Sequence, residues 1–220
     1  MRLSFSRIFL LLIASLSPVI AQSLSVGLKA GVSLREEFSG SLGVIHDESK
    51  RYTLGPMVDL RLPLHFALEF DALYRREGYT LQNFDSNFFH SYGGRERSNS
   101  WEFPIVAKYR LPGAARVKPY IGIGYAPRIV YGSQVDTYVQ NDLSGNVISV
   151  SSATRDSNYD ATHGLVIEGG FNLPVPHFHV SPEIRYTRWH TPFLYVVGSY
   201  GDLYFSRRNQ VEVLFGLTWH

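Results

Sequence analysis

The sequence predicts an all-β fold, an eight-stranded antiparallel up-and-down barrel that crosses a membrane. Eight segments alternate apolar and polar residues at every second position, the period of a β-strand with one apolar face. Each apolar face holds about five or six residues of one parity, so each strand has about 10 to 12 residues, the length of a tilted transmembrane strand. Short turns and long polar loops alternate between the segments, as in an up-and-down meander.

The alternation is clearest in two predicted strands at the centre of the chain, 100–111 and 118–132. Trp101, Phe103 and Ile105 share one face of their segment, whereas Glu102 and Lys108 share the other. In chain order, the predicted strands are 24–34, 52–62, 65–76, 100–111, 118–132, 160–173, 178–189 and 209–219. Strand by strand, the apolar parity includes Val26 and Leu28, Leu54 and Leu60, Phe66 and Phe70, Phe103 and Ile105, Ile121 and Ile123, Leu165 and Ile167, Val180 and Ile184, and Val213 and Leu217.

The connections between strands are of two kinds. Short ones begin with Leu-Pro, and proline ends strand pairing because it has no backbone N–H to donate; they lie at 62–64, 111–117 and 173–177. Long ones are rich in Ser, Gly, Asn, Asp and Arg and are expected to be loops; they lie at 35–51, 77–99, 132–159 and 190–208. In the third long connection, β-prone segments flank the turn signal at 142–146, which predicts that two strands continue as a hairpin beyond the membrane.

The N-terminus indicates export. Arg2 and Arg7 flank a short n-region, an apolar run follows, and Ala21 suits cleavage, so we expect a signal peptide at 1–21 and a barrel domain at 22–220. Without these two arginines, 19 basic residues face 19 acidic ones. This neutral balance argues against a nucleic-acid partner. The chain has no cysteine, so a disulfide framework or thiolate metal site is impossible.

The orientation of the two faces separates a membrane barrel from a soluble lipocalin-type barrel or sandwich. A soluble barrel would bury the apolar face. Aromatic residues gather near the strand ends, as expected of girdles at the two membrane interfaces. Those towards the long loops are Tyr52, Tyr74, Trp101, Tyr131, Tyr159 and Trp189; those towards the short turns are Phe66, Tyr109, Phe178 and Trp219. We therefore expect the apolar face to point outward.

The polar face then forms the barrel interior. An eight-stranded barrel is only wide enough inside for side chains to fill, so buried charges there have to pair. Seven basic residues on the polar parity match seven acidic ones. This predicted charge ladder comprises Lys29, Asp59, Arg61, Glu69, Asp71, Arg75, Glu102, Lys108, Arg110, Arg128, Glu168, Glu183, Arg185 and Glu212.

On these residues the chain resembles the small bacterial outer-membrane β-barrel proteins, the OmpA/OmpX-like and PorT-like group. The resemblance spans the mature chain and rests on the signal peptide, on Trp101 to Ile105 with Lys108 and Tyr109, on Lys118-Pro119-Tyr120 with Gly122 and Gly124, and on the aromatic end of the last strand. It implies short periplasmic turns, long extracellular loops and location in the outer membrane. It also implies that the barrel-assembly machinery reads the last strand, although His220 follows the terminal aromatic residue.

The sequence gives only weak evidence for a catalytic or metal-binding site. His179 and Ser181 are spaced like a lipid A deacylase pair, but they lie beside a short turn and point inward. His46, His90, His163 and His190 are scattered, and Asp136, Asp142, Asp156 and Asp160 lack calcium-loop spacing. We expect no catalytic residue, cofactor or metal.

Two surface features suggest partners. A possible contact loop carries Phe84, Phe88, Phe89, Tyr92, Arg95 and Arg97, and the third long connection could offer a strand edge to another protein. Arginines expected near the long-loop rim suit the phosphates of lipopolysaccharide; they are Arg51, Arg75, Arg76, Arg95, Arg97, Arg155, Arg188, Arg207 and Arg208. The expected function is a non-enzymatic outer-membrane barrel with a plugged lumen and a structural or surface-interaction role. The alternatives are a narrow porin-like channel or transporter and, less favoured, a lipid A-modifying enzyme.

Overall fold

The structure, a computed structural model, describes residues 24–34, 38–40, 44–47, 51–84, 90–112, 117–141, 146–158, 161–192, 195–197 and 203–219. The predicted signal peptide lies outside these ranges, as do Phe88, Phe89 and Tyr159 of the sequence predictions. Within the described ranges, the chain forms no helix of the length and hydropathy needed to cross a membrane.

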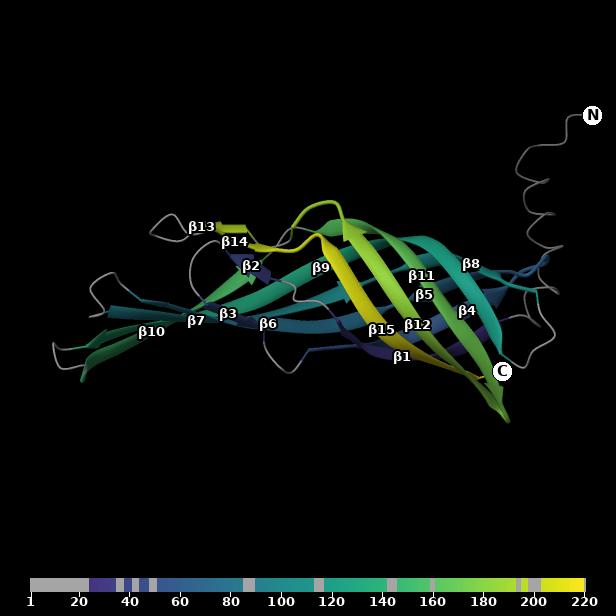
Figure 1. Ribbon diagram of the computed structural model, residues 1–220, viewed down its shortest axis with the longest axis horizontal. Helices are drawn as coiled ribbons and strands as arrows, with labels where there is room; N and C mark the ends of the chain where they lie inside the picture. Colours follow the sequence, from purple (N-terminus) through teal and green to yellow (C-terminus); the bar gives the residue numbers. More distant parts are fainter. Residues whose placement is uncertain are drawn as a thin grey trace, which may run out of the picture.

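The strands close into an antiparallel barrel of eight members, as the sequence predicts (Figure 1). The barrel strands are β1 (Leu24–Ser33), β4 (Tyr52–Arg61), β5 (Phe66–Asp71) with β6 (Leu73–Phe84), β7 (His90–Glu102) with β8 (Ile105–Arg110), β9 (Lys118–Asn141), β11 (Thr162–Val175), β12 (Phe178–Trp189) and β15 (Asn209–Trp219). Closure joins the first strand to the last, because Val26 of β1 lies opposite Trp219 of β15. The circle is complete with every pairing antiparallel.

Two barrel strands are interrupted without losing their register. Met57 lies opposite Asp71 before the β5–β6 break, and Leu54 lies opposite Tyr74 beyond it, so both pieces follow one alignment. At the break the Ala72 N–H donates to the Pro56 carbonyl at 3.0 Å. Proline has no N–H to return that bond, which interrupts the ladder there without shifting the strands. The break at Pro104 between β7 and β8 has the same cause.

The barrel wall exposes its apolar face and buries its charged face, the reverse of a soluble protein. Leu165 and Ile123 on the outer face are 64% and 65% exposed, whereas Lys29, Glu69 and Glu212 on the inner face are fully buried. The alternation follows the predicted parity, because successive residues of a strand point to opposite faces of the sheet. The apolar side chains thus form the outside of the barrel and the charged ones its core.

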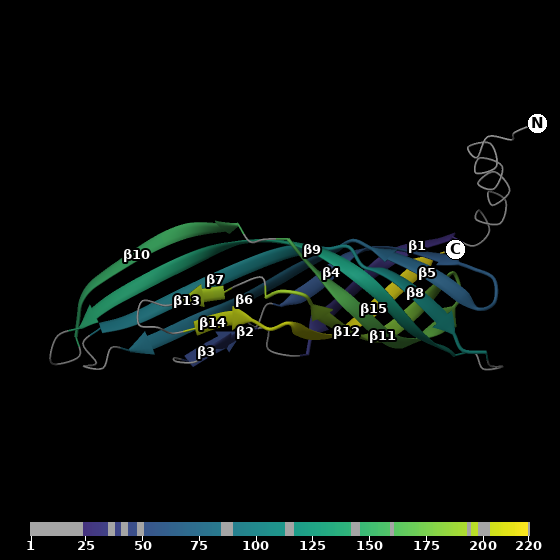
Figure 2. The ribbon, with the colours of Figure 1, turned by 90° about the horizontal axis from the view of Figure 1, so that it is seen from above.

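Three barrel strands, β6, β7 and β9, extend beyond the barrel and with two further strands form an arm, which is the long structure at the left of Figures 1 and 2. Its strand order is β10–β9–β7–β6–β3, where β10 is Val147–Asn158 and β3 is Val44–Asp47. The predicted hairpin beyond the membrane is present, since β10 pairs with the distal half of β9. The prediction of a loop at 77–99 is wrong, because β6 continues to Phe84 and β7 starts at His90.

The other long connections also contain short strands. β2 (Phe38–Gly40), β13 (Tyr195–Val197) and β14 (Leu203–Ser206) form a small three-stranded sheet at the base of the arm, in the order β13–β14–β2 (Figure 1). The connections at 35–51 and 190–208, expected to be loops, are therefore joined to each other by strand pairing. Among the described residues, the long-loop end is mostly β-sheet, while the connections at the opposite end are short.

Candidate functional site: the charged barrel interior

The middle of the barrel interior holds a cluster of seven charged side chains, the middle cluster, from five strands. Its members are the cations Lys29, Lys108 and Arg185 and the carboxylates Glu69, Asp71, Glu168 and Glu183. They meet there because inward positions of one level on neighbouring strands project into the same narrow space.

Lys29 connects three of these carboxylates. Its Nζ lies 2.5 Å from Glu69 Oε1, 3.2 Å from Asp71 Oδ2 and 3.0 Å from Glu183 Oε1. Arg185 closes the opposite side, with Nη2 at 2.8 Å from Asp71 Oδ2. An ammonium group has three donors, so Lys29 is fully used by these three acceptors.

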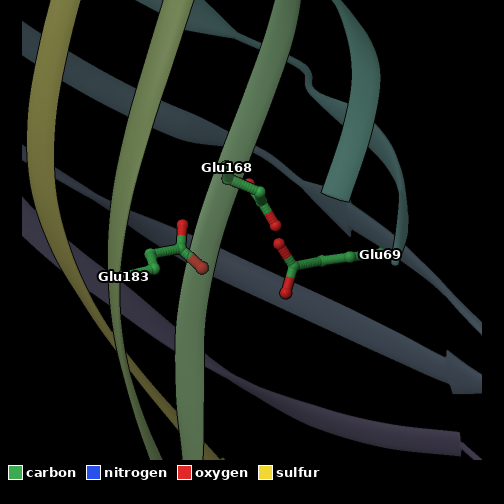
Figure 3. A group of neighbouring side chains, drawn as sticks. All are labelled: Glu69, Glu168 and Glu183. Carbon is green, nitrogen blue, oxygen red and sulfur yellow. The ribbon is translucent and has the colours of Figure 1, made fainter. Parts of the chain in front are cut away.

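Three carboxylates of the middle cluster point towards one another (Figure 3). One oxygen each from Glu69, Glu168 and Glu183 lies within 4.8 Å of the others, a spacing that would suit a cation. Lys108 already fills this role, because its Nζ lies 2.5 Å from Glu69 Oε2 and 3.0 Å from Glu168 Oε1. The Tyr120 hydroxyl adds a hydrogen bond to Glu183 Oε2 at 2.8 Å. The three carboxylates are therefore bridged by Lys108 within a salt-bridge network.

A second cluster, the upper cluster, lies towards the long-loop end. Arg75 Nη1 is 2.9 Å from Glu212 Oε1, and its Nε also contacts Glu77. Arg128 Nη2 is 3.3 Å from both Glu77 oxygens, and Arg128 Nε is 3.5 Å from Glu102 Oε1. These five side chains are all buried, so two arginines bridge three carboxylates away from solvent.

Neutral side chains complete the upper cluster. Thr53 Oγ1 and Gln210 Nε2 donate to the two oxygens of Glu212 at 2.8 Å and 2.7 Å. The indole N–H of Trp189 donates to Gln210 Oε1 at 2.7 Å, and its ring lies 4.9 Å from the Arg128 guanidinium carbon. Trp189 therefore caps the charged network with an aromatic surface.

A third group lies near the short turns. Arg110 Nη2 contacts both oxygens of Asp59, at 2.7 Å and 2.9 Å, and Arg61 lies beside them. Between this pair and the middle cluster remains a cavity of about 10 Å³, enough for about one water molecule. Paired charges thus occupy the interior at three successive levels.

The sequence predicted where these charges lie better than it predicted their number. All 14 residues of the predicted ladder are on the inner side of the wall, with Arg61 and Arg110 only half-buried. Glu77 was missed, because the predicted strand ended before it; its parity matches that of Arg75, which was the signal available. With Glu77, the described interior holds seven basic and eight acidic side chains.

Two predictions about individual side chains are wrong. Trp189 was assigned to the outer aromatic girdle, but it shares the inward parity of Arg185 and is only 3% exposed. Arg75 was also counted among the rim arginines available to lipopolysaccharide, yet it is buried in the upper cluster. Both residues lie near the end of a predicted strand, but the face on which each side chain lies follows from its parity.

The remaining predicted residues lie elsewhere. Tyr74 and Trp101 meet edge to edge on the outer wall at 5.6 Å between ring centroids, and Phe66 and Tyr109 at 5.2 Å near the short turns. Ser181 is buried in the interior near the short-turn end, with His179 half-buried two residues before it.

The predicted contact loop is instead part of the arm. Phe84 and Tyr92 belong to β6 and β7, one residue out of direct register, since Phe84 lies opposite Ser91 and Tyr92 opposite Asn83. Arg95 and Arg97 are exposed on β7. The described part of this segment is therefore a paired β-sheet, and not a loop.

Comparison with known proteins agrees with the architecture. The outer membrane protein beta-barrel domain matches residues 20–188 of the chain. The structure is similar to that of Neisserial surface protein A (NspA), with 17% sequence identity and a TM-score of 0.54, over 89% of this chain and 96% of that one. It is also similar to OprG from Pseudomonas aeruginosa, with 12% identity and a TM-score of 0.51, over 89% and 93% of the two chains. No curated protein matches the chain.

Proposed function

Because the chain belongs to the outer membrane protein beta-barrel domain family, we propose that it is a non-catalytic outer-membrane barrel, closed to solutes, that holds an extracellular β-sheet arm as a binding surface. One observation carries the proposal. The interior is filled at three levels by paired charges, with a cavity of only about 10 Å³ between the lowest two.

The energetics of the interior support a permanently closed lumen. Opening a path would separate buried ion pairs such as Lys29–Glu69 and Arg75–Glu212. Removing one partner of a buried pair costs about 3 to 5 kcal/mol, because the other charge is left uncompensated. Several pairs would have to separate together, so spontaneous opening is expected to be too rare for steady conduction.

The arm supports a role outside the membrane. β9 has 24 residues, which at about 3.3 Å per residue gives a strand of about 80 Å, well beyond the 40 to 45 Å of a bilayer with headgroups. Its distal part pairs on one side with β7 and on the other with β10. Strand pairing makes this extension stiffer than a loop, so it can hold a binding surface away from the membrane.

The edge of the arm is the surface that we propose for partner binding. β10 pairs with β9 alone within the described residues, and Val147, Ile148 and Val150 are each at least 60% exposed. An unpaired strand edge can accept an added strand from another protein, with main-chain hydrogen bonds supplying affinity. At the opposite end, we propose that β15 is the segment read by the barrel-assembly machinery.

Conductance in planar bilayers tests the closed lumen. The mature chain, folded and inserted, should give no steady open steps, with an open porin as positive control. Steady steps of uniform size would overturn the proposal in favour of a narrow channel. Lipid A from cells that express the protein should keep its mass; a changed acylation state would instead indicate a lipid-modifying enzyme.

A further inference from the structure

A pocket of about 500 Å³ lies on the outer wall of the barrel near the base of the arm, and its lining includes Trp189, which caps the upper cluster of the interior. It is formed where β9, β11 and β12 come together and the chain enters β15. Its side chains of interest are Tyr125, His163, His190, Arg188 and Arg208. No role for these residues follows from the closed lumen or from the arm.

One wall of the pocket is a stack of three rings. The rings of His163 and His190 are 4.9 Å apart at 11° to each other, and Tyr125 stacks on His163 at 5.6 Å. The stack is anchored by the backbone, because the His190 N–H donates to the His163 carbonyl at 2.8 Å. The pairing of β11 with the end of β12 therefore holds the two histidine rings side by side.

The lining of the pocket also includes two arginines. Arg188 and Arg208 are exposed, and Arg188 Nη1 donates to Asn209 Oδ1 at 3.1 Å. This bond orients the guanidinium group and leaves most of its five N–H donors for a ligand. The lining includes no carboxylate. Two cations without an acidic neighbour in the pocket favour an anion.

The level of the pocket indicates what kind of anion binds. Leu165 lines the pocket opposite Arg188 and is 64% exposed, and the apolar surface continues along β11 towards the short turns to Ile167. The pocket thus lies where the apolar belt ends, which in an outer-membrane barrel is the level of the extracellular headgroups. An anion carried by a lipid could place its acyl chains along Leu165 and its charge between the arginines.

We propose that this pocket binds the phosphate monoester headgroup of an anionic glycolipid of the outer leaflet. The proposal rests on the outer-membrane location and not on the closed lumen. Guanidinium groups bind phosphate through paired, charge-assisted hydrogen bonds. The stacked rings supply a flat surface for a sugar ring. Free phosphate offers the same charge but has no apolar part to occupy the Leu165 border.

Binding is tested with the full mature barrel folded in detergent, with lipids counted by native mass spectrometry. The probes are bis-phosphorylated lipid A, dephosphorylated lipid A and inorganic phosphate. The doubly substituted variant Arg188→Gln/Arg208→Gln should bind the bis-phosphorylated lipid about tenfold more weakly or worse, because each charged hydrogen bond contributes on the order of a factor of ten. Lys118→Gln, which removes an exposed cation at the short-turn end, should bind it normally.

Three outcomes would overturn the proposal: equal binding of both lipids, undiminished binding by the double variant, or displacement of the lipid by millimolar inorganic phosphate. The last would assign the pocket to free phosphate. Heat-modifiable gel migration checks that each variant is folded. Because the substituted residues lie outside the lumen, a failure here leaves the conductance result unchanged, and the two proposals fail separately.

Discussion

Lys29 shows how strongly the interior depends on single residues. Its ammonium group is fully buried and contacts Glu69, Asp71 and Glu183 within 3.2 Å. Arg185 Nη2 also lies within 3.3 Å of the same three carboxylates, so the two cations bridge them together. A buried charge is tolerated only when it is paired, so removing one lysine here leaves several acids with too few cations.

Replacing this lysine should therefore destabilise the barrel. Lys29→Met keeps the length of the side chain but removes the charge, leaving four carboxylates with two cations in the middle cluster. We expect the free energy of unfolding to fall by about 3 to 5 kcal/mol. Urea unfolding of the mature barrel in lipid vesicles, followed by heat-modifiable gel migration, measures this change.

Two further variants make the Lys29 prediction specific. Lys118→Met removes an exposed cation and should change stability by no more than about 0.5 kcal/mol. Adding Asp71→Asn to Lys29→Met removes one of the uncompensated acids, so the double variant should lose less than the sum of the single losses. Simple additivity of the two substitutions would contradict the assignment of a coupled network.

Residue parity explains which interior residues were predictable. The ladder residues were found because alternation alone decides the face on which a side chain lies. Glu77 and Trp189 were missed for a reason of position: both lie at or just beyond the ends of predicted strands, where the sequence does not say whether pairing continues. Which charges pair, such as Lys29 with Glu183, depends on the register between strands that are distant in sequence. The sequence alone could therefore not predict these pairs.

At the level of elements, the long connection at 77–99 shows the limit of local signals. It contains Gly93 and Gly94 among polar residues, a composition typical of loops. In the structure Gly93 lies opposite Gln82 on one side and Thr137 on the other. A strand paired on both sides gains its stability from its neighbours, so tertiary pairing overrides the weak propensity.

The arm can be located by labelling, because the chain has no cysteine. Ser151→Cys places a thiol on β10, where the native residue is exposed. A maleimide on a polymer too large for porins should label it in intact cells, since the proposed orientation places the arm outside the cell. Lys118→Cys lies near a short turn, which the same orientation places in the periplasm, so this matched control should react only after the outer membrane is permeabilised.

The reverse labelling pattern would contradict the orientation of the barrel. Labelling of neither variant in intact cells, with both reacting after permeabilisation, would contradict the exposure of the arm. Either result would leave the closed interior untouched, because the ion pairs do not depend on which end faces outward.

At the scale of the whole molecule, the charged interior of the barrel and the arm are separate structures. The ion pairs that the structure describes in the interior use residues of β6 only as far as Glu77 and of β9 only as far as Arg128, counted from the short-turn end. The barrel closes through β1 and β15, neither of which is a strand of the arm. The two parts should therefore be separable by truncation.

The truncation can be made at one level of the sheet, because Gly78 lies opposite Arg97, Arg97 opposite Ser133, and Ser133 opposite Asp156. Joining Gly78 to Arg97 and Ser133 to Asp156 by Asn-Gly turns removes the distal arm and leaves every barrel strand paired. Since the interior side chains all remain, the trimmed barrel should still migrate as a heat-modifiable species and show no steady conductance. The untrimmed barrel is the control in both assays. If the trimmed barrel folds and conducts in uniform open steps, the arm rather than the charged interior closes the lumen.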